Sequence, residues 1–245
     1  MASWAKTFVV DDQPNVVMRS NLGQVRIASG QARQVSVEAH DHGIRLPLFG
    51  AWEVRDLHVC DLQVPSRIQL DVKFPRLRYF GGFVLPLSSI SLTAPHLAGV
   101  DVETWDGRIV LDRFAGHCRL LSGSGSIRAA VDGDLDATAH NGGIRATGRF
   151  GVLNLHSHSG NISVEVEPGS PLTSEWRIAT LNGSIEFRCP PGLAAEIDAD
   201  AGGGRVFNGS TRTSTYRGTW NGGGPLIHLR CSNGNIRILP GRDVS

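Results

Sequence analysis

The sequence has almost no net charge and no long apolar segment. Its 24 lysine and arginine residues oppose 23 aspartate and glutamate residues, and the basic residues stand singly between apolar ones. Because a nucleic-acid groove requires clustered basic residues, we expect no nucleic-acid partner. No run of about 18 apolar residues occurs, and residues 1–10 lack the apolar core of a secretory signal. We therefore expect no direct membrane insertion, and a cytoplasmic location as written, or the cell surface if this is a trimmed part of an exported protein.

Cysteines and catalytic signatures are also scarce. The four cysteines are far apart in the sequence and have no CxxC spacing: Cys60, Cys118, Cys189 and Cys231. This pattern predicts reduced thiols, most of them buried, and neither a disulfide framework nor a zinc site. The sequence also lacks a phosphate-binding Gly loop ending in Lys and Ser or Thr, a nucleophile elbow and a zincin helix. We therefore expect no cofactor and no enzymatic activity.

Glycine, in contrast, is abundant. The 30 glycines follow no collagen-like triplet period, so they are expected to punctuate a regular structure. Alternating apolar residues and frequent β-branched residues indicate strands between them.

A short motif recurs seven times: a small or polar residue, Gly, any residue, then Ile or Val. The copies are Asp106-Gly107-Arg108-Ile109, Ser124-Gly125-Ser126-Ile127, Asn141-Gly142-Gly143-Ile144, Ser159-Gly160-Asn161-Ile162, Asn182-Gly183-Ser184-Ile185, Gly203-Gly204-Arg205-Val206 and Asn233-Gly234-Asn235-Ile236. Successive glycines are 18, 17 and 18 residues apart before the steps lengthen to 23, 21 and 30. Further glycines at 116, 133 and 151 divide the early steps, which predicts two strands and two turns per repeat.

The repeat predicts an all-β, single-stranded β-solenoid (a β-helix or β-roll) with coils of about 18 residues. The residue two positions after each glycine, from Ile109 to Ile236, should point into a shared core. We expect the glycines to take positive φ at tight corners. Because Asn-Gly and Asp-Gly are also hairpin signals, an antiparallel β-meander or sandwich is the alternative.

With these motifs, residues 99–238 resemble the bacterial putative-adhesin family, a domain of unknown function with a repetitive β-solenoid. The segments that carry the likeness are Thr180-Leu181-Asn182-Gly183-Ser184-Ile185 and residues 229–238, and residues 21–27 look like the family's opening strands. The resemblance implies surface adhesion and brings no catalytic motif.

We divide the chain into N-terminal strands and a cap region of the same domain (1–98), the repetitive solenoid (99–240) and a tail (241–245). Residues 43–98 combine prolines with aromatics, and we expect them to cap the open end of the solenoid, with a binding loop as the alternative.

The repeat also predicts which polar residues share an outer face. Asp101, Arg119, Asp136 and Asn154 should form one column, with Glu103 in the next column and Trp105 beside it. These residues are the predicted ligand face. His140, His156 and His158 should lie near one another and are weak candidate metal ligands, with His40 and His42 weaker still, because exposed histidines on a polar strand need no metal.

The leading functional prediction is a non-enzymatic structural or adhesion module whose partner is an unknown protein, a glycan or another copy of the chain. One alternative is a polysaccharide-acting β-helix enzyme that uses the carboxylates Asp101 and Glu103. The other is a self-assembling cytoplasmic scaffold.

Overall fold

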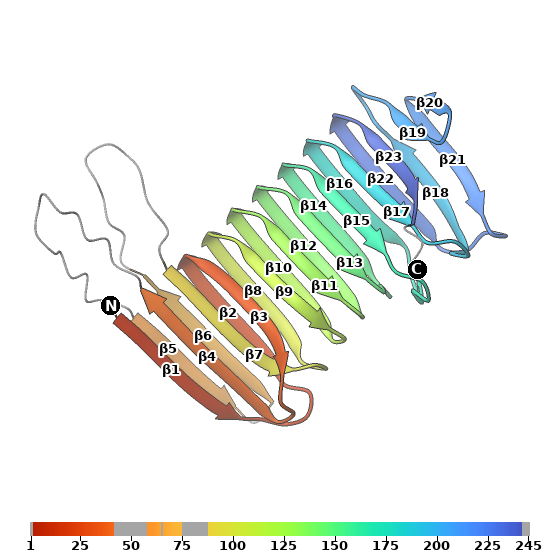
Figure 1. The fold of residues 1–245 in the computed structure, drawn as a ribbon. Helices are drawn as coiled ribbons and strands as arrows, with labels where there is room; N and C mark the ends of the chain where they lie inside the picture. Colours follow the sequence, from red (N-terminus) through yellow and green to blue (C-terminus); the bar gives the residue numbers. More distant parts are fainter. Residues whose placement is uncertain (1, 42–57, 65, 75–87, 242–245) are drawn as a thin grey trace, which may run out of the picture.

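The computed structural model describes residues 2–41, 58–64, 66–74 and 88–241. These residues form two large mixed β-sheets of 12 and 11 strands, and they contain neither a helix nor a closed barrel. The two sheets face each other along an elongated stack (Figure 1). In the same ranges no helix has the length and apolar character needed to cross a membrane. The all-β prediction is confirmed.

Each sheet has a spatial order that differs from the chain order. The 12-stranded sheet runs β1 (Ala2–Val9), β4 (Gln34–Asp41), β7 (Ser88–Pro95), β3 (Gln24–Gly30), β9 (Ile109–Phe114), β11 (Ile127–Val131), β13 (Ile144–Gly148), β15 (Ile162–Val166), β17 (Ile185–Cys189), β23 (Ile236–Pro240), β19 (Val206–Asn208) and β20 (Thr211–Thr213). The 11-stranded sheet runs β21 (Thr215–Trp220), β18 (Ala195–Asp200), β22 (Leu226–Asn233), β16 (Trp176–Asn182), β14 (Leu153–Ser159), β12 (Asp134–Asn141), β10 (His117–Ser124), β8 (Gly99–Asp106), β2 (Asn15–Leu22), β6 (Arg67–Lys73) and β5 (His58–Val64).

At each of the seven repeat corners the chain passes from the 11-stranded sheet to the 12-stranded sheet. We call a strand of the 11-stranded sheet, its corner and the following strand of the 12-stranded sheet a corner unit. Between β8 and β17 the neighbouring units pair in parallel in both sheets. The antiparallel alternative is therefore wrong for this region.

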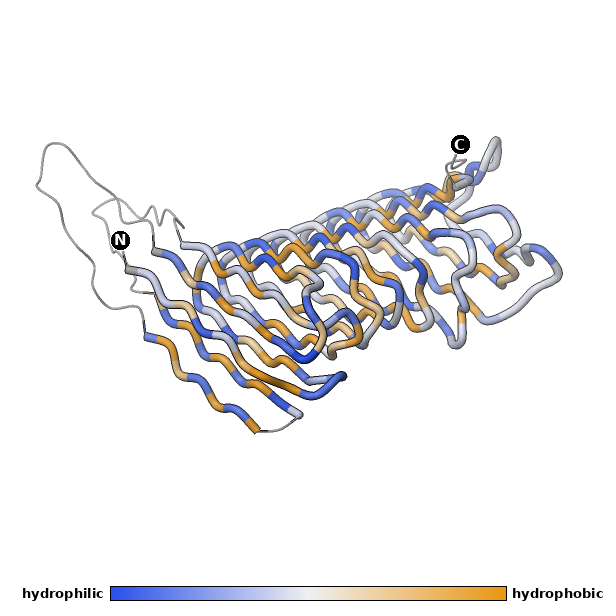
Figure 2. Tube along the Cα trace, turned by 60° about the horizontal axis from the view of Figure 1, so that its bottom comes forward, coloured by the Kyte–Doolittle hydropathy of each residue, from blue (hydrophilic) through white to orange (hydrophobic). Residues whose placement is uncertain are grey.

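The predicted inward column is present. Ile127 pairs with Ile109 on one side and Ile144 on the other, and the column continues through Ile162 to Ile185. All of these side chains are at most 2% exposed and belong to one core cluster formed by both sheets. The tube in Figure 2 shows the hydrophobic and hydrophilic positions alternating along the strands. Stacking at about 4.8 Å per strand thus joins the apolar edges of single units into a continuous core.

The last two repeats are not stacked in sequence order. The unit β22–β23 lies between β16–β17 and β18–β19, so the Gly234 corner follows the Gly183 corner in space and the Gly204 corner comes after it. At the other end, β2–β3 lies between β6–β7 and β8–β9. The spacing of 21 residues from Gly183 to Gly204 therefore belongs to a connection that passes over one unit position. The spacing of 30 residues from Gly204 to Gly234 belongs to the connection that returns to this position.

The glycines at the corners are needed for close backbone approach. A Cβ on any of the seven repeat glycines would come within 3.0 Å of the carbonyl oxygen of the glycine in the neighbouring unit. Only Gly183 and Gly234 have a positive φ, at 158° and 147°. The expectation of positive φ is therefore wrong for the other five, whose requirement is the absence of a side chain.

Buried hydroxyl and thiol groups line the inside of these corners. The donor three residues before a repeat glycine bonds to the carbonyl of the preceding corner: Ser122 to Gly107 at 3.1 Å, Ser157 to Gly142 at 3.0 Å, Thr180 to Gly160 at 2.8 Å and Cys231 to Gly183 at 2.9 Å. Thr104 occupies the equivalent position, but its buried Oγ1 has no hydrogen-bond partner within the described residues. The small residues near the corners thus satisfy backbone carbonyls away from water.

The cysteines are free thiols, as predicted, and Cys118, Cys189 and Cys231 are buried. Burial raises the pKa of Cys118 and of Cys189 to about 12. These thiols therefore remain protonated and unreactive at neutral pH. Cys60 is exposed on the edge strand β5.

Both ends of the parallel stack finish in antiparallel strands. β1 pairs with β4 and β5 pairs with β6 at one end, while β18 pairs with β21 and β19 pairs with β20 at the other. An ion pair joins Lys6 of β1 to Asp61 of β5 across the two edge strands. Most of the predicted aromatic cap, including residues 43–57 and 75–87, lies outside the described residues.

Candidate functional site

The predicted ligand face is a registered surface on the outside of the 11-stranded sheet. Arg119 pairs with Asp101 on one side and with Asp136 on the other, and Asp136 pairs in turn with Asn154. Arg19 of β2 extends the second column beyond Glu103. The predicted columns are therefore present, while the binding of a ligand to them stays a prediction.

The charges on this face neutralise one another. The Nε atom of Arg19 lies 3.5 Å from the Glu103 carboxylate, and the Arg119 guanidinium lies 3.9 Å from Asp101. Both pairs are substantially exposed, so each contributes little to stability. They do give the face alternating charges in place of a field of one sign.

A small depression brings two predicted residues together with residues that sequence reasoning missed. Glu103 and the exposed Trp105 share it with Arg19, Asp71 and Lys73, and its volume is about 160 Å³. Asp71 and Glu103 lie on opposite sides of Arg19, because β2 is between β6 and β8. The repeat gave no sign of this grouping, since β2 and β6 precede the repetitive region.

A second charged group on the same sheet was also missed. Asp198 accepts a hydrogen bond from Arg230 at 2.6 Å and another from Arg217 at 3.4 Å. His228 lies between Glu175, at 2.9 Å, and Asp198, at 3.7 Å. The hydrogen bond from Arg230, followed by its charge and that of Arg217, lowers the pKa of Asp198. The group exists because β22 lies between β16 and β18, an order that no local pattern indicates.

The three stronger candidate metal ligands do not converge. His140 and His158 are neighbours, as predicted, and their rings stack with centroids 4.8 Å apart. His156 lies in a different column, where it pairs with Thr138 and Ala179. Across the described ranges no three His, Cys, Asp or Glu side chains are grouped so as to hold a metal ion.

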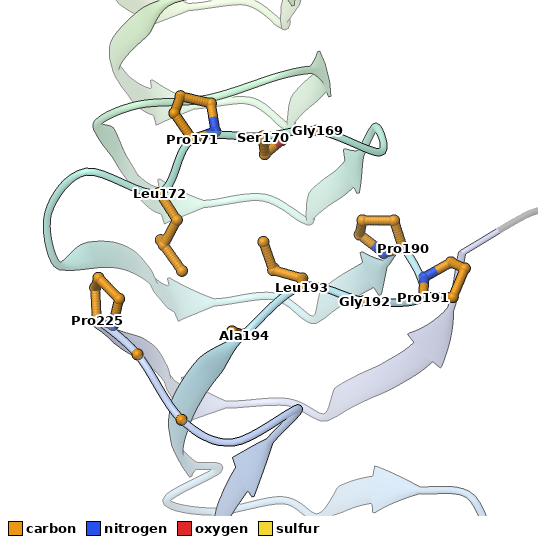
Figure 3. A pocket seen from close by; sticks show the side chains of 12 residues that line it. Gly169, Ser170, Pro171, Leu172, Pro190, Pro191, Gly192, Leu193, Ala194 and Pro225 are labelled. Carbon is orange, nitrogen blue, oxygen red and sulfur yellow. The ribbon is translucent and has the colours of Figure 1, made fainter.

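A larger hollow lies at the edge away from the repeat corners. It has a volume of about 520 Å³ and is formed by the loops after β15, β17 and β21 (Figure 3). Its side chains are those of prolines and small or aliphatic residues, including Pro171, Leu172, Pro190, Leu193 and Pro225. None is ionisable, so this hollow offers no group for acid-base chemistry.

Comparison with known proteins gives similar solved structures, including two bacterial proteins. No protein-family model matches the chain, and no curated protein is found to be similar to it. A putative cell adhesion protein from Clostridium sporogenes is 10% identical, with a TM-score of 0.36, over 98% of this chain and 100% of the other. A putative adhesin from Bacteroides fragilis is 11% identical, with a TM-score of 0.43, over 98% and 97%.

Proposed function

We propose that the chain is a β-solenoid that acts as a non-enzymatic adhesion or binding module. The observation that carries this proposal is the straight, registered columns of side chains on the outer sheet faces, such as Asp101, Arg119 and Asp136. A surface of this kind offers repeated contacts to an extended partner, a glycan or a protein. Small-molecule sites, in contrast to these open columns, usually lie in enclosed apolar pockets.

An adhesion assay with a chemical readout tests the proposal. The whole chain, coated on beads, is presented to panels of immobilised glycans and matrix proteins, and the glycan supernatants are then assayed for new reducing ends. We expect retention of the beads on at least one surface with no release of product. Release of reducing ends, or absence of retention on every surface, would overturn the proposal.

The solenoid and its assembly are tested by shape. Small-angle scattering should give an elongated particle, and a compact globule would contradict the solenoid. Light scattering after size exclusion distinguishes a monomer from end-to-end polymers. We expect no filaments, because the charged pair Lys6–Asp61 lies at the edge strands where another copy would have to pair.

A polysaccharide-acting enzyme is the second candidate function, and the depression at Trp105 favours it. Asp71 and Glu103 lie two strands apart, so their backbones are separated by about 9.6 Å, and an exposed indole is beside them. Glycosidases use a pair of carboxylates that flank the scissile bond. Reducing ends released by the wild type but not by Glu103→Gln would establish the enzyme.

A further inference from the structure

The outer face of the 12-stranded sheet carries a column of arginines. Arg128 and Arg145 are directly opposite each other on the adjacent strands β11 and β13. Arg26 on β3 lies in the same column, separated from Arg128 by Val110 on β9. All three arginines are exposed, and together they are called the arginine ladder.

The arginine ladder has no internal counter-charge. Within the described residues, none of its three guanidinium groups has a carboxylate within 4.0 Å, whereas Arg19, Arg119, Arg217 and Arg230 on the opposite sheet are all ion-paired. One carboxylate, Asp112, projects from the same face between β3 and β13. Like charges directly opposite each other on neighbouring strands repel, so the ladder destabilises the fold slightly unless an anion joins it.

The geometry of the ladder defines the kind of anion. Neighbouring strands are about 4.8 Å apart, so Arg128 and Arg145 present charges at that spacing and Arg26 follows about 9.6 Å from Arg128. A guanidinium group binds a carboxylate or sulfate through two parallel hydrogen bonds. A straight row of them fits a linear chain that carries one anionic group on each repeating unit.

We propose that the arginine ladder binds a linear acidic polysaccharide that runs across the strands along the axis of the stack. The proposal rests on the function as a binding module and assigns its ligand class and its face. The anionic groups of the polysaccharide pair with Arg145, Arg128 and Arg26 in turn. Arg108, exposed at the corner before β9, lies beside the same row.

Single-stranded nucleic acid fits this face less well. Such ligands combine a basic track with aromatic side chains on which the bases stack. The outward residues of β3, β9, β11 and β13 include no aromatic side chain: they are Gln24, Arg26, Ala28, Val110, Asp112, Arg113, Arg128, Ala130, Arg145 and Thr147. The face therefore offers charge without stacking, as a polyuronate or sulfated glycan requires.

Calorimetric titration with polygalacturonate tests the proposal, with neutral dextran as the uncharged probe. The wild type should bind polygalacturonate and not dextran. Arg128→Gln combined with Arg145→Gln should weaken the Kd about a hundredfold, since each charged hydrogen-bonding partner contributes about tenfold or more. The slope of log Kd against the logarithm of the salt concentration should decrease by about one for each arginine removed.

The matched control is Arg67→Gln combined with Arg177→Gln, two exposed arginines of the opposite sheet whose replacement should leave the Kd unchanged. An equal loss in both double variants, or none in the ladder variant, would overturn the assignment of this face. Tighter binding of an oligothymidylate or of phosphatidylserine vesicles than of polygalacturonate would overturn the ligand class. If no polyanion binds, the ladder proposal fails, while retention on neutral glycans or proteins in the bead assay still reports on the module itself.

Discussion

The two outer faces of the stack are made by the same corner units but arrange their charges differently. Over β2, β8, β10 and β12, four carboxylates and two arginines point outward, and both arginines are ion-paired: the residues are Arg19, Asp101, Glu103, Arg119, Asp134 and Asp136. Over β3, β9, β11 and β13, the regularly alternating outward residues include three arginines and one carboxylate with no ion pair between them: Arg26, Asp112, Arg128 and Arg145. The other exposed arginine of these strands, Arg113 on β9, is paired with Glu167. A net charge of +1 thus conceals one region whose arginines are ion-paired and another with a row of arginines that are not.

This difference shows how parallel register turns isolated residues into a surface. Arg128 and Arg145 stand singly in the sequence, each three residues after a repeat glycine. In the sheet the same position becomes one column, in which Arg128 and Arg145 are direct neighbours. The charge that a β-stack presents to a partner therefore depends on what occupies one repeat position, and very little on overall composition.

The largest expected effect comes from breaking the core that both faces share. Ile127→Asp should lower the free energy of unfolding by about 4 kcal/mol or more, because it removes a buried side chain and buries an unpaired carboxylate. Arg128→Asp, the adjacent outward position, is the matched control and should change stability by less than about 1 kcal/mol. Urea denaturation measures both, and equal losses would contradict the inward column.

Disturbing the register of the corners comes next. Gly142→Ala should cost about 1 to 3 kcal/mol, since the new Cβ meets the carbonyl oxygen of Gly125. Gly99→Ala is the control, because a Cβ there comes no closer than 3.4 Å to Asn15. Thermal unfolding of the two variants compares them, and similar melting temperatures would show that close approach does not explain the corner glycines.

The corner hydroxyls provide a third test, within the sheet that carries the paired charges. Thr180→Val removes a buried hydrogen bond to Gly160 and should cost about 1 to 2 kcal/mol. Thr104→Val removes a hydroxyl that has no partner and should be neutral or slightly stabilising. Urea midpoints measure both, and a loss at position 104 as large as at position 180 would contradict this account.

Acid should weaken the paired face. The pKa of Asp198 is lowered by its hydrogen bond with Arg230, so its stabilising contribution is present above the unfolded pKa of about 3.9 and is lost as the pH falls through the folded value. We expect a loss on the order of 1 kcal/mol at acid pH in the wild type. His228 also lies beside Asp198, at 3.7 Å.

The measurement is the difference in stability between the wild type and Asp198→Asn from neutral pH to about pH 2. That difference should shrink as the pH falls, and Arg230→Gln should remove most of the same pH dependence. A difference that is constant with pH would show that the Asp198–Arg230 pair does not contribute to acid sensitivity.

Much of this architecture could be predicted from the sequence, because the repeat position sets both the corner and the inward side chain. Ile109 to Ile185 and the outer column of Asp101, Arg119 and Asp136 occur in the predicted register. The interchange of the Gly204 and Gly234 units could not be predicted, since each has the same local motif and the choice depends on which edge is free when the strand arrives.

The charged groups were harder to predict for the same reason. His228 lies between Glu175 and Asp198 only because β22 inserts between β16 and β18, and Asp71 meets Arg19 only because β2 inserts beside β6. The arginine ladder was available to sequence reasoning, because Arg128 and Arg145 occupy the same repeat position. Counting basic residues along the chain does not reveal the ladder, whereas comparing residues at the same repeat position does.

The smallest expected effect concerns the unpaired face. Arg145→Gln should raise the free energy of unfolding by about 0.2 to 0.5 kcal/mol at low salt, because it removes repulsion with Arg128 directly opposite. The gain should disappear at about 1 M salt, where the screening length is about 3 Å. Arg119→Gln on the opposite face should show a small loss under the same conditions, since it breaks an ion pair with Asp101. Urea denaturation at both salt concentrations measures these changes, and a loss at position 145 as large as at position 119 would mean that the arginines of the ladder are stabilised within the fold, leaving no electrostatic reason for an external anion.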